Sequence, residues 1–358
     1  MFLCVLLLGL ILKNEIQVES ARILGIFPTP SKSHYALGNV LLKELARRGH
    51  EVTMISPFEE KHPPPNSSYR DIKLEFEISE ADKSSNFFSS DMSNPYLVTL
   101  FLNYVGCKML NATLNFPNVQ KLLESEEKFD AVIMDQFVDD GFSYFAHRFG
   151  ANNILVSTTT AKAWVNPLVG NPAPPSVVAD LLLNFPNRMN FLERLQNTIF
   201  YLYSVLNIHL YFFPQQNKII KENLPEARPL YDYLYNVSLV LINTHESYTD
   251  PSSMVPVMKN VGGYHVSPAK KLPEDLQKFM DDSKEGVVYF SMGSNLKSKD
   301  MPKEVIEAII RVFAKLKIKI LWKWEDDSLP GQPPNLKLSK WLPQQEILGK
   351  CLDIIIHE

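Results

Sequence analysis

The sequence predicts an α/β protein in which parallel strands alternate with helices. Short apolar runs that end at proline or polar residues alternate along the chain with segments whose apolar residues recur at helical spacing. The first strand, helix and strand occupy about 35 residues, the size of a right-handed βαβ unit, which implies a parallel sheet. The composition, with 45% hydrophobic and 21% charged residues in a chain of 358, is that of about two folded domains.

The first βαβ unit is defined by three neighbouring segments. Residues 22–28 (RILGIFP) form an apolar run that ends at proline, which is typical of a buried strand. Apolar residues at positions 37, 40, 41 and 45 predict a helix, and the Arg-Arg-Gly sequence at 47–49 is typical of a helix end. Residues 51–57 (EVTMISP) follow as the second strand.

The alternation continues to about residue 244 and predicts a doubly wound sheet. Further strands are expected at 72–78, 129–135, 153–157 and 239–244. Helices are expected at about 95–126, 139–149 and 187–223, with a proline-rich loop at 166–175. The uncharged stretch 195–217 is interrupted by polar residues, which favours a packed or interfacial amphipathic helix over a membrane span.

A second α/β cycle begins at residue 286. The two glycines at 262–263 and the Pro-, Lys- and Asp-rich stretch 266–282 before it predict a linker. Strands are expected at 287–292, 318–324 and 336–342, and a helix at 303–315. Fewer than 80 residues belong to this second cycle.

The N-terminal residues MFLCVLLLGLIL predict a secretory signal peptide. The apolar core is too short to span a bilayer stably, and we expect cleavage after Ser20, with an uncleaved signal anchor as the alternative. The chain would then enter the secretory pathway. Three sequons, at Asn66, Asn111 and Asn236, are candidate glycosylation sites in that compartment.

Charge and motif content exclude several classes of protein. Lysine and arginine total 36 against 40 aspartate and glutamate, and no basic run supplies the field that nucleic acid binding needs. A G-x-G-x-x-G sequence after the first strand, a P-loop, an H-E-x-x-H and a G-x-S-x-G are absent. A D-x-D triplet is also absent, so we expect no cofactor and no metal at a nucleotide-sugar site.

Polar residues that follow the strands of the first domain are its candidate site. Ligands of parallel sheets collect beyond the carboxyl ends of the strands. His34 follows the first strand and Asp135 ends another, so a carboxylate could orient an imidazole that takes a proton from a substrate hydroxyl. The residues alone leave a second interpretation open, because His and Asp at such positions often serve only as surface or capping residues.

Two segments of the second domain could recognise a nucleotide. Small residues around Ser294, where a strand ends, would let backbone N–H groups approach an anion, although a simple turn explains them equally well. Trp341 could stack on a flat base while Gln344, three residues later, binds its edge. A tryptophan near a strand end is otherwise usually a core residue.

Six segments together resemble the UDP-glycosyltransferases of the glucuronosyltransferase type. The segments 21–35 and 129–137 look like the insect members, and the similarity runs from about residue 21 to 348. The segments are 21–35 (ARILGIFPTPSKSHY), 129–137 (FDAVIMDQF), 261–263 (VGG) with 268–273 (PAKKLP), 287–295 (VVYFSMGSN) and 341–348 (WLPQQEIL).

The resemblance implies a GT-B fold of two facing Rossmann-like domains. It implies inverting transfer of a sugar from a UDP-sugar, such as UDP-glucose or UDP-glucuronate, to a hydroxyl of a small lipophilic acceptor. In this family pattern His34 matches the catalytic base and Asp135 the acid that orients it, while Trp341 and Gln344 match uridine contacts and Ser294 a position near the diphosphate. We expect the acceptor pocket to be apolar and to include 200–213.

The resemblance also implies a domain division and a cellular location. We expect a signal peptide at 1–20, an acceptor-binding domain at 21–265, a linker at 266–285 and a partial UDP-sugar-binding domain at 286–358, because the family continues past this point into more of the donor domain and a membrane anchor. The expected location is the lumen of the endoplasmic reticulum, with homo- or heterodimers of related enzymes as further partners. The alternatives are a non-catalytic relative that binds lipophilic ligands or pairs with full-length enzymes, and an incomplete gene model.

Overall fold

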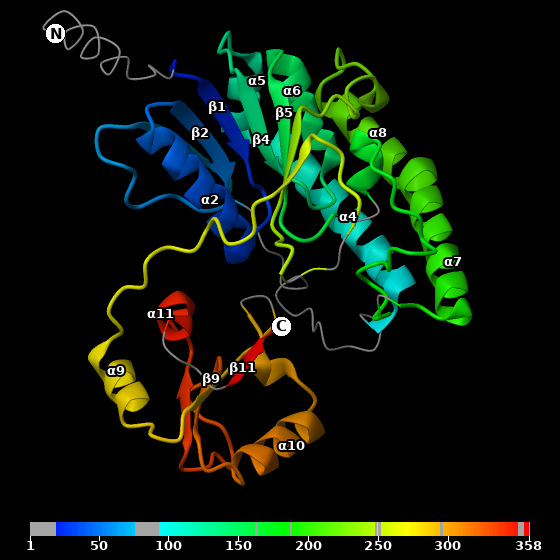
Figure 1. Cartoon of the computed structure of the whole chain (residues 1–358). Coiled ribbons are helices and arrows are strands. Elements are labelled where there is room, and N and C mark those ends of the chain that lie inside the picture. The colour runs from blue at the N-terminus through cyan, green and yellow to red at the C-terminus, as the bar shows by residue number, and fades with distance from the viewer. Residues whose placement is uncertain are drawn as a thin grey trace, which may run out of the picture.

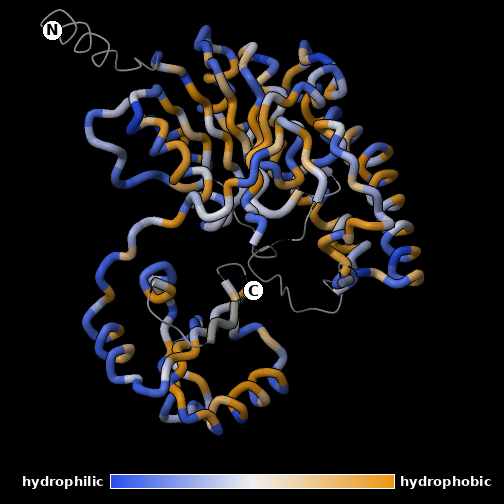
Figure 2. Tube along the Cα trace, in the orientation of Figure 1, coloured by the Kyte–Doolittle hydropathy of each residue, from blue (hydrophilic) through white to orange (hydrophobic). Residues whose placement is uncertain are grey.

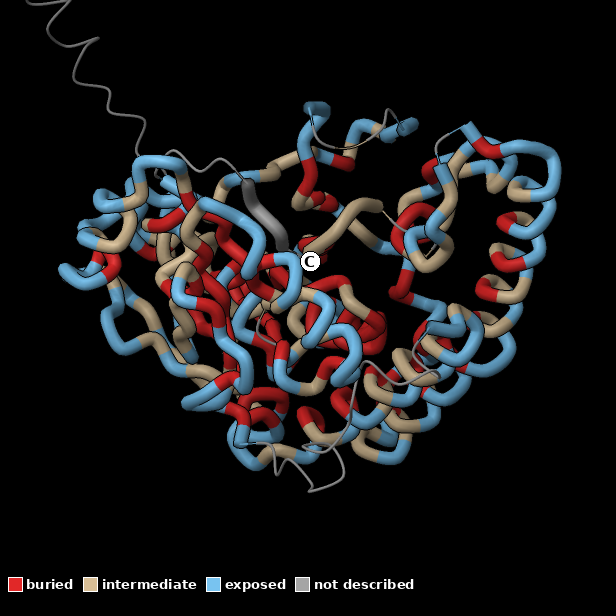
Figure 3. Tube along the Cα trace, turned by 90° about the horizontal axis from the view of Figure 1, so that it is seen from below, coloured by how far each residue is buried: buried red, intermediate tan, exposed pale blue. Residues whose placement is uncertain are grey.

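The computed structural model describes residues 19–75, 93–161, 164–186, 188–247, 249, 252–293, 296–349 and 354–357. Within them the chain forms two parallel sheets, each with its own hydrophobic core. In Figure 1 the second sheet lies below the first, on the side where the strands of the first sheet end. Figure 3 shows that buried positions lie mainly in the interior, whereas the periphery is largely exposed.

The first sheet has seven parallel strands in the order β3-β2-β1-β4-β5-β6-β7. The strands are β1 (Arg22–Ile26), β2 (Glu51–Ser56), β3 (Ser68–Lys73), β4 (Ala131–Asp135), β5 (Asn152–Ser157), β6 (Leu239–Ile242) and β7 (Met258–Asn260). The connecting α-helices are α2 (Lys32–Arg47), α4 (Pro95–Leu114), α5 (Pro117–Glu124), α6 (Ser143–Phe149), α7 (Phe191–Asn207) and α8 (Phe213–Asn223). Short 3-10 or π-helical segments carry the label η: η2 (Asp140–Phe142), η3 (Asn166–Val169), η4 (Ile208–Phe212) and η5 (Leu230–Asp232).

Helices cover both faces of the first sheet, because alternate strand residues point to opposite sides. Leu24 and Ile26 of β1 belong to a core shared with α4, α5, α6 and α8. Ile23 packs on the other face, with residues of α2 such as Leu42. The helix approaches closely at Gly25, where a Cβ would lie 2.2 Å from a methyl carbon of Leu42.

The second sheet has four parallel strands in the order β10-β9-β8-β11. Its elements are β8 (Val287–Ser291), η6 (Ser298–Asp300), α10 (Lys303–Phe313), β9 (Lys319–Lys323), β10 (Leu336–Ser339), α11 (Gln344–Leu348) and β11 (Ile354–His357). Its core surrounds the fully buried Trp322, whose ring packs edge-on against Phe313. Strand β11 pairs with β8 in a register that places His357 opposite Ser291.

Several predicted boundaries differ from the structure for identifiable reasons. The helix expected over 95–126 is two helices, because Pro117 cannot continue α4 and instead begins α5. The strand expected at 72–78 is β3, which begins earlier, at Ser68, and ends at Lys73; positions 76–78 lie outside the described residues. The expected linker 266–282 contains a helix, α9 (Glu274–Asp281), whose buried Leu276 packs on the second domain.

Candidate functional site

The strand order of the first sheet creates one point where ligands are expected to bind. From β1 the chain moves to one side through β2 and β3 and then crosses to the other side at β4. The connections after β1 and β4 therefore diverge and leave a crevice at the carboxyl ends of the two strands. Helix α2 begins directly after β1, and Asp135 is the last residue of β4.

The structure brings His34 and Asp135 together at this point. Nδ1 of His34 lies 2.7 Å from Oδ2 of Asp135, and the same oxygen accepts a hydrogen bond of 3.0 Å from Thr29 Oγ1. The Asp135 side chain is fully buried, whereas 14% of the His34 side chain is exposed. Phe137 packs edge-on against the imidazole with ring centroids 4.8 Å apart. A buried carboxylate that accepts from Nδ1–H leaves Nε2 free to accept a proton.

Two more carboxyl groups are buried directly after Asp135. Burial, together with the charge of Asp135, raises the pKa of Asp139 well above its usual range. Burial also raises the pKa of Asp140 to about 6, although a hydrogen bond of 2.8 Å from Gln136 Nε2 opposes the shift. The wall behind the histidine–aspartate pair therefore carries fewer negative charges at neutral pH than its three carboxyl groups could supply.

A close contact with α4 holds the loop that carries these acids. Val138 has a φ of 54°, which is rare for a β-branched residue. Gly106 of α4 lies against its carbonyl, since a Cβ at position 106 would be 1.9 Å from the Val138 oxygen. The Gln216 side chain of α8 donates to the same oxygen and accepts from the Gly141 N–H. The loop after β4 is thus fixed from two neighbouring helices.

One predicted nucleotide residue of the second domain, Trp341, lies near the start of α2. Trp341 is 59% exposed, and Nζ of Lys32, two residues before His34, lies 4.7 Å from the centre of its ring. Gln344 begins α11, and its Oε1 accepts from Tyr289 Oη at 3.4 Å. Trp341 therefore lies against the first domain, whereas the hydrogen bond to Gln344 comes from β8 of its own domain. Ser294 lies outside the described residues.

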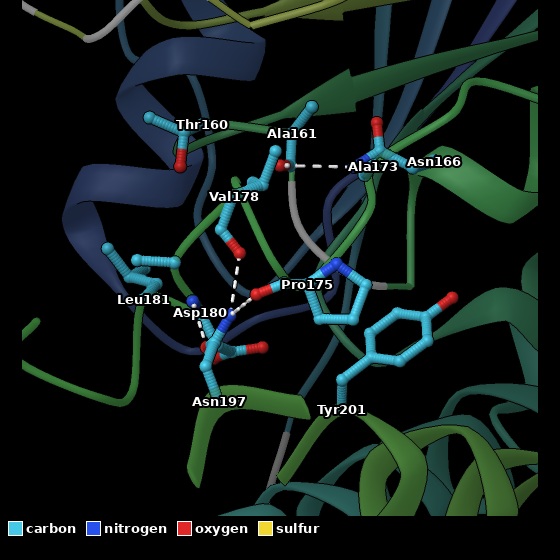
Figure 4. A pocket seen from close by; sticks show the side chains of 11 residues that line it. Thr160, Ala161, Asn166, Ala173, Pro175, Val178, Asp180, Leu181, Asn197 and Tyr201 are labelled. Atoms are coloured by element: carbon cyan, nitrogen blue, oxygen red, sulfur yellow. Dashed lines mark hydrogen bonds between the residues drawn. The ribbon is translucent and has the colours of Figure 1, made fainter. Parts of the chain in front are cut away.

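A small pocket lies between the loop after β5 and helix α7 (Figure 4). The cavity measures about 80 Å³ and is lined by side chains that include Thr160, Asp180 and Tyr201. Asn197 of α7 organises the loop: its Nδ2 donates to the Pro175 and Val178 carbonyls, and its Oδ1 accepts from the Asp180 N–H. Such a volume holds only a few waters, well below the roughly 300 Å³ of the smallest usual ligand sites.

Three phenylalanines of the segment 200–213 are buried away from this pocket. Phe200, Phe212 and Phe213 are each at most 3% exposed, and none of them lines the pocket. These three rings pack inward against neighbouring residues, whereas Tyr201 of the same segment lines the pocket, and the position of the acceptor pocket stays a prediction. The residues of α7 that do line the pocket are Asn197 and Tyr201.

Sequence reasoning missed several residues around the predicted pair. Asp139 and Asp140 are adjacent in the sequence and follow a strand end, a signal that could have placed them at the site. Thr29 and Lys32 flank the same loop as His34, but nothing in their sequence pattern marks them. Among the residues that the structure describes, no group of three or more His, Cys, Asp or Glu side chains is arranged to hold a metal ion.

A family model and similar curated sequences indicate the same protein family. The model of the family described as "UDP-glucoronosyl and UDP-glucosyl transferase" matches residues 23–352. The chain is 32% identical over 335 residues to UDP-glycosyltransferase UGT5 of Dactylopius coccus. The aligned region covers 92% of this chain and 64% of that protein. It is 30% identical over 340 residues to the 2-hydroxyacylsphingosine 1-beta-galactosyltransferase of Rattus norvegicus, with 92% and 61% covered. The chain thus spans less than two thirds of these relatives.

Comparison with solved structures shows the GT-B fold. The glycotransferase of kitacinnamycin superposes with a TM-score of 0.56 at 15% identity, over 95% of this chain and 75% of that one. UGT89C1 of Arabidopsis thaliana, complexed with UDP-L-rhamnose, gives 0.51 at 13% identity, over 95% and 75%. Because a family model covers most of its length and curated relatives exceed 30% identity, the chain belongs to the UDP-glucoronosyl and UDP-glucosyl transferase family.

Proposed function

We propose that this protein transfers a sugar from a UDP-sugar, UDP-glucose or UDP-glucuronate, to a hydroxyl group of a small lipophilic acceptor. His34 acts as the general base, Asp135 orients it, and the reaction inverts the configuration at the sugar without a metal ion. The observation that carries the proposal is the contact of 2.7 Å between His34 Nδ1 and Asp135 Oδ2 at the point where the strand order of the first sheet diverges.

The base is needed because an alcohol is a poor nucleophile at neutral pH. Nε2 of His34 takes the proton of the acceptor hydroxyl as the oxygen bonds to the anomeric carbon of the sugar. The bond from that carbon to the UDP oxygen breaks, and its electron pair leaves with UDP. A positioned base of this kind contributes about 10²- to 10⁴-fold in rate. Asp135 accepts from Nδ1–H throughout and stabilises the imidazolium that forms.

The donor would bind between the two domains, against the second. Trp341 offers an exposed ring on which uracil can stack, and Gln344 can bind the edge of the base. Support for a nucleotide-sugar donor comes from a structural neighbour, since UGT89C1 is complexed with UDP-L-rhamnose. Lys32 stands over the Trp341 ring and would give way to the base.

The test is a transfer assay with His34→Ala and a matched histidine control. The chain is incubated with UDP-glucose or UDP-glucuronate and a panel of phenols and alcohols, and both glycoside and UDP are measured. We expect product with the wild type and a loss of 100-fold or more in His34→Ala. His62→Ala, which alters an exposed residue of a loop remote in sequence from the site, should leave the rate unchanged.

Calorimetry with UDP separates donor binding from chemistry. His34→Ala should bind UDP as the wild type does, because the donor contacts proposed here lie on the second domain, whereas Trp341→Ala should weaken UDP binding by about tenfold or more. Undiminished transfer by His34→Ala would refute the role of the base. A wild type that neither binds UDP nor forms product would refute the proposed activity of this chain.

A further inference from the structure

Asp139 is a buried acid close to Asp135 that the proposed transfer reaction does not use. Both residues are fully buried, and the strands of the sheet that ends beside them consist largely of hydrophobic positions (Figure 2). Burial and the charge of Asp135 together raise the pKa of Asp139 well above its usual range. Two ionised carboxylates in such surroundings would repel each other and lack water, so one of them keeps its proton.

The hydrogen bonds of Asp135 identify it as the ionised member of the two acids. Its Oδ2 lies 2.7 Å from His34 Nδ1 and accepts a hydrogen bond of 3.0 Å from Thr29 Oγ1. Both donors serve the same oxygen. The other oxygen, Oδ1, is buried and accepts no hydrogen bond from the residues that the structure describes. A buried carboxylate with one unpaired oxygen is costly, so a donor at Oδ1 would stabilise the ionised form.

The hydrogen bonds of Asp139 show which of its oxygens can supply that donor. The backbone N–H of Phe137 donates to Asp139 Oδ1 at 2.8 Å. An N–H only donates, so Oδ1 acts as the carbonyl oxygen of a protonated acid and the proton belongs to Oδ2. Asp139 Oδ2 is buried and likewise has no partner among the described residues. The two acids therefore offer a complementary pair, a proton on Asp139 Oδ2 and an acceptor at Asp135 Oδ1.

Contacts from two helices hold Asp139 in place. The left-handed φ of 54° at Val138 turns the chain directly before Asp139. Gln216 of α8 donates to the Val138 carbonyl at 3.2 Å, and Gly106 of α4 lies against the same carbonyl. An unfavourable backbone conformation at a β-branched residue persists only where surrounding contacts enforce it, and such residues cluster at functional sites. The position of the acid is therefore imposed by α4 and α8 rather than by its local sequence.

The other titratable groups around the two acids already have partners. Among the described residues they include His34 of α2, Asp140 of η2 and Tyr264 after β7. His34 is paired with Oδ2 of Asp135, and Asp140 accepts from Gln136 Nε2 at 2.8 Å. Burial and the charge of Asp135 raise the pKa of Tyr264, whose hydroxyl donates to the Leu37 carbonyl at 3.0 Å. Helices α4 and α8 contact the loop through a glycine and a glutamine, which do not titrate.

We propose that Asp139 is a positioning residue whose protonated carboxyl group donates a hydrogen bond from Oδ2 to Oδ1 of Asp135. The inference rests on the proposed function, in which Asp135 orients His34. A charge-assisted bond of this kind fixes the Asp135 carboxylate with Oδ2 toward the imidazole and takes up part of its negative charge. The carboxylate then attracts an imidazolium less strongly, so His34 stays deprotonated, and able to act as a base, down to lower pH.

Two substitutions separate a proton donor from a merely structural residue. Asp139→Asn keeps a donor, because its Nδ2 can donate to Asp135 while its Oδ1 accepts from the Phe137 N–H; Asp139→Leu has a similar size and no donor. In the transfer assay, the acid limb of the kcat/KM profile should lie close to that of the wild type in Asp139→Asn. In Asp139→Leu it should move to higher pH by about one unit. If Asp139 were ionised, both substitutions would remove a negative charge and move the limb to lower pH. That result, or an unchanged limb in Asp139→Leu, would overturn the proposal.

Two spectroscopic measurements on the full chain decide the proposal without any sugar transfer. NMR of protein with labelled histidine follows the titration of His34, identified as the signal that is missing from His34→Ala, and should show the same displacements as the acid limb. The infrared difference between wild type and Asp139→Asn at pH 8 should contain the C=O stretch of a protonated carboxyl group. The matched difference for Asp140→Asn should contain an ionised carboxylate, because the pKa of Asp140 is about 6.

The infrared spectra need only the wild type and Asp139→Asn, so they decide the proposal even where Asp139→Leu does not fold. An ionised carboxylate in the difference spectrum of Asp139→Asn would overturn it. A wild type that shows the protonated group and the expected histidine titrations but transfers no sugar would refute the proposed function and leave the hydrogen bond between the two acids established.

Discussion

Replacing Asp140 by asparagine should stabilise the first domain at neutral pH. Asp140 is 2% exposed, and its carboxylate accepts a hydrogen bond of 2.8 Å from Gln136 Nε2. Burial raises its pKa from 3.8 to about 6. The folded state therefore keeps the proton over a range where the unfolded chain has lost it, and stability falls as the pH rises through this range.

The size of the effect follows from the two pKa values. One pKa unit corresponds to about 1.4 kcal/mol, so the ionised carboxylate costs about 3 kcal/mol at pH 7. At pH 4.5 only the unfolded chain has largely ionised, and the cost is about 1 kcal/mol. Asparagine does not titrate, and its oxygen can still accept from Gln136. The stabilisation by Asp140→Asn should thus be about 2 kcal/mol larger at pH 7 than at pH 4.5.

The assay must follow the first domain alone, because the two domains can unfold separately. Hydrogen exchange in increasing urea, measured on peptides from β1 and β4, gives the unfolding free energy of that domain at both pH values. Asp232→Asn, at an exposed position, is the control and should change either value by no more than about 0.5 kcal/mol. If Asp140→Asn changes the unfolding free energy equally at both pH values, or lowers it more at pH 7, ionisation of the buried carboxylate does not destabilise the folded state. Either result would refute the reasoning.

Two further predictions concern contacts around the site. Gly106→Ala should destabilise the first domain by about 1–3 kcal/mol, because its methyl group cannot fit 1.9 Å from the Val138 oxygen. The measurement is urea unfolding, with Leu100→Ala, on the exposed side of α4, as the control. Equal midpoints for the two variants would contradict the contact. Tyr264→Phe removes the hydrogen bond of 3.0 Å to the Leu37 carbonyl and should lower the free energy of unfolding by about 1 kcal/mol. The measurement is the thermal midpoint, which should fall; an unchanged midpoint would show that this bond does not stabilise the fold.

The strands that the sequence predicts well are those buried on both faces. Segments such as 22–28 and 129–135 are continuous apolar runs, and the structure contains β1 and β4 within them. Strand β3 was misplaced because its sequence, SYRDIK, is polar and lies at the edge of the sheet. Strand β7 was missed because three residues, Met-Lys-Asn, carry no periodicity. Helix α9 was hidden in a stretch whose prolines and lysines resemble a linker.

The candidate site was predictable only where topology determines it. Parallel strands bring their carboxyl ends to one edge, so the contact between His34 and Asp135 follows from two strand assignments. The burial of Asp139 and Asp140 does not follow from such assignments, because acidic residues are rarely buried and composition argues against it. The loop that carries them lies against Gly106 of α4, a packing relation between segments about 30 residues apart in the chain.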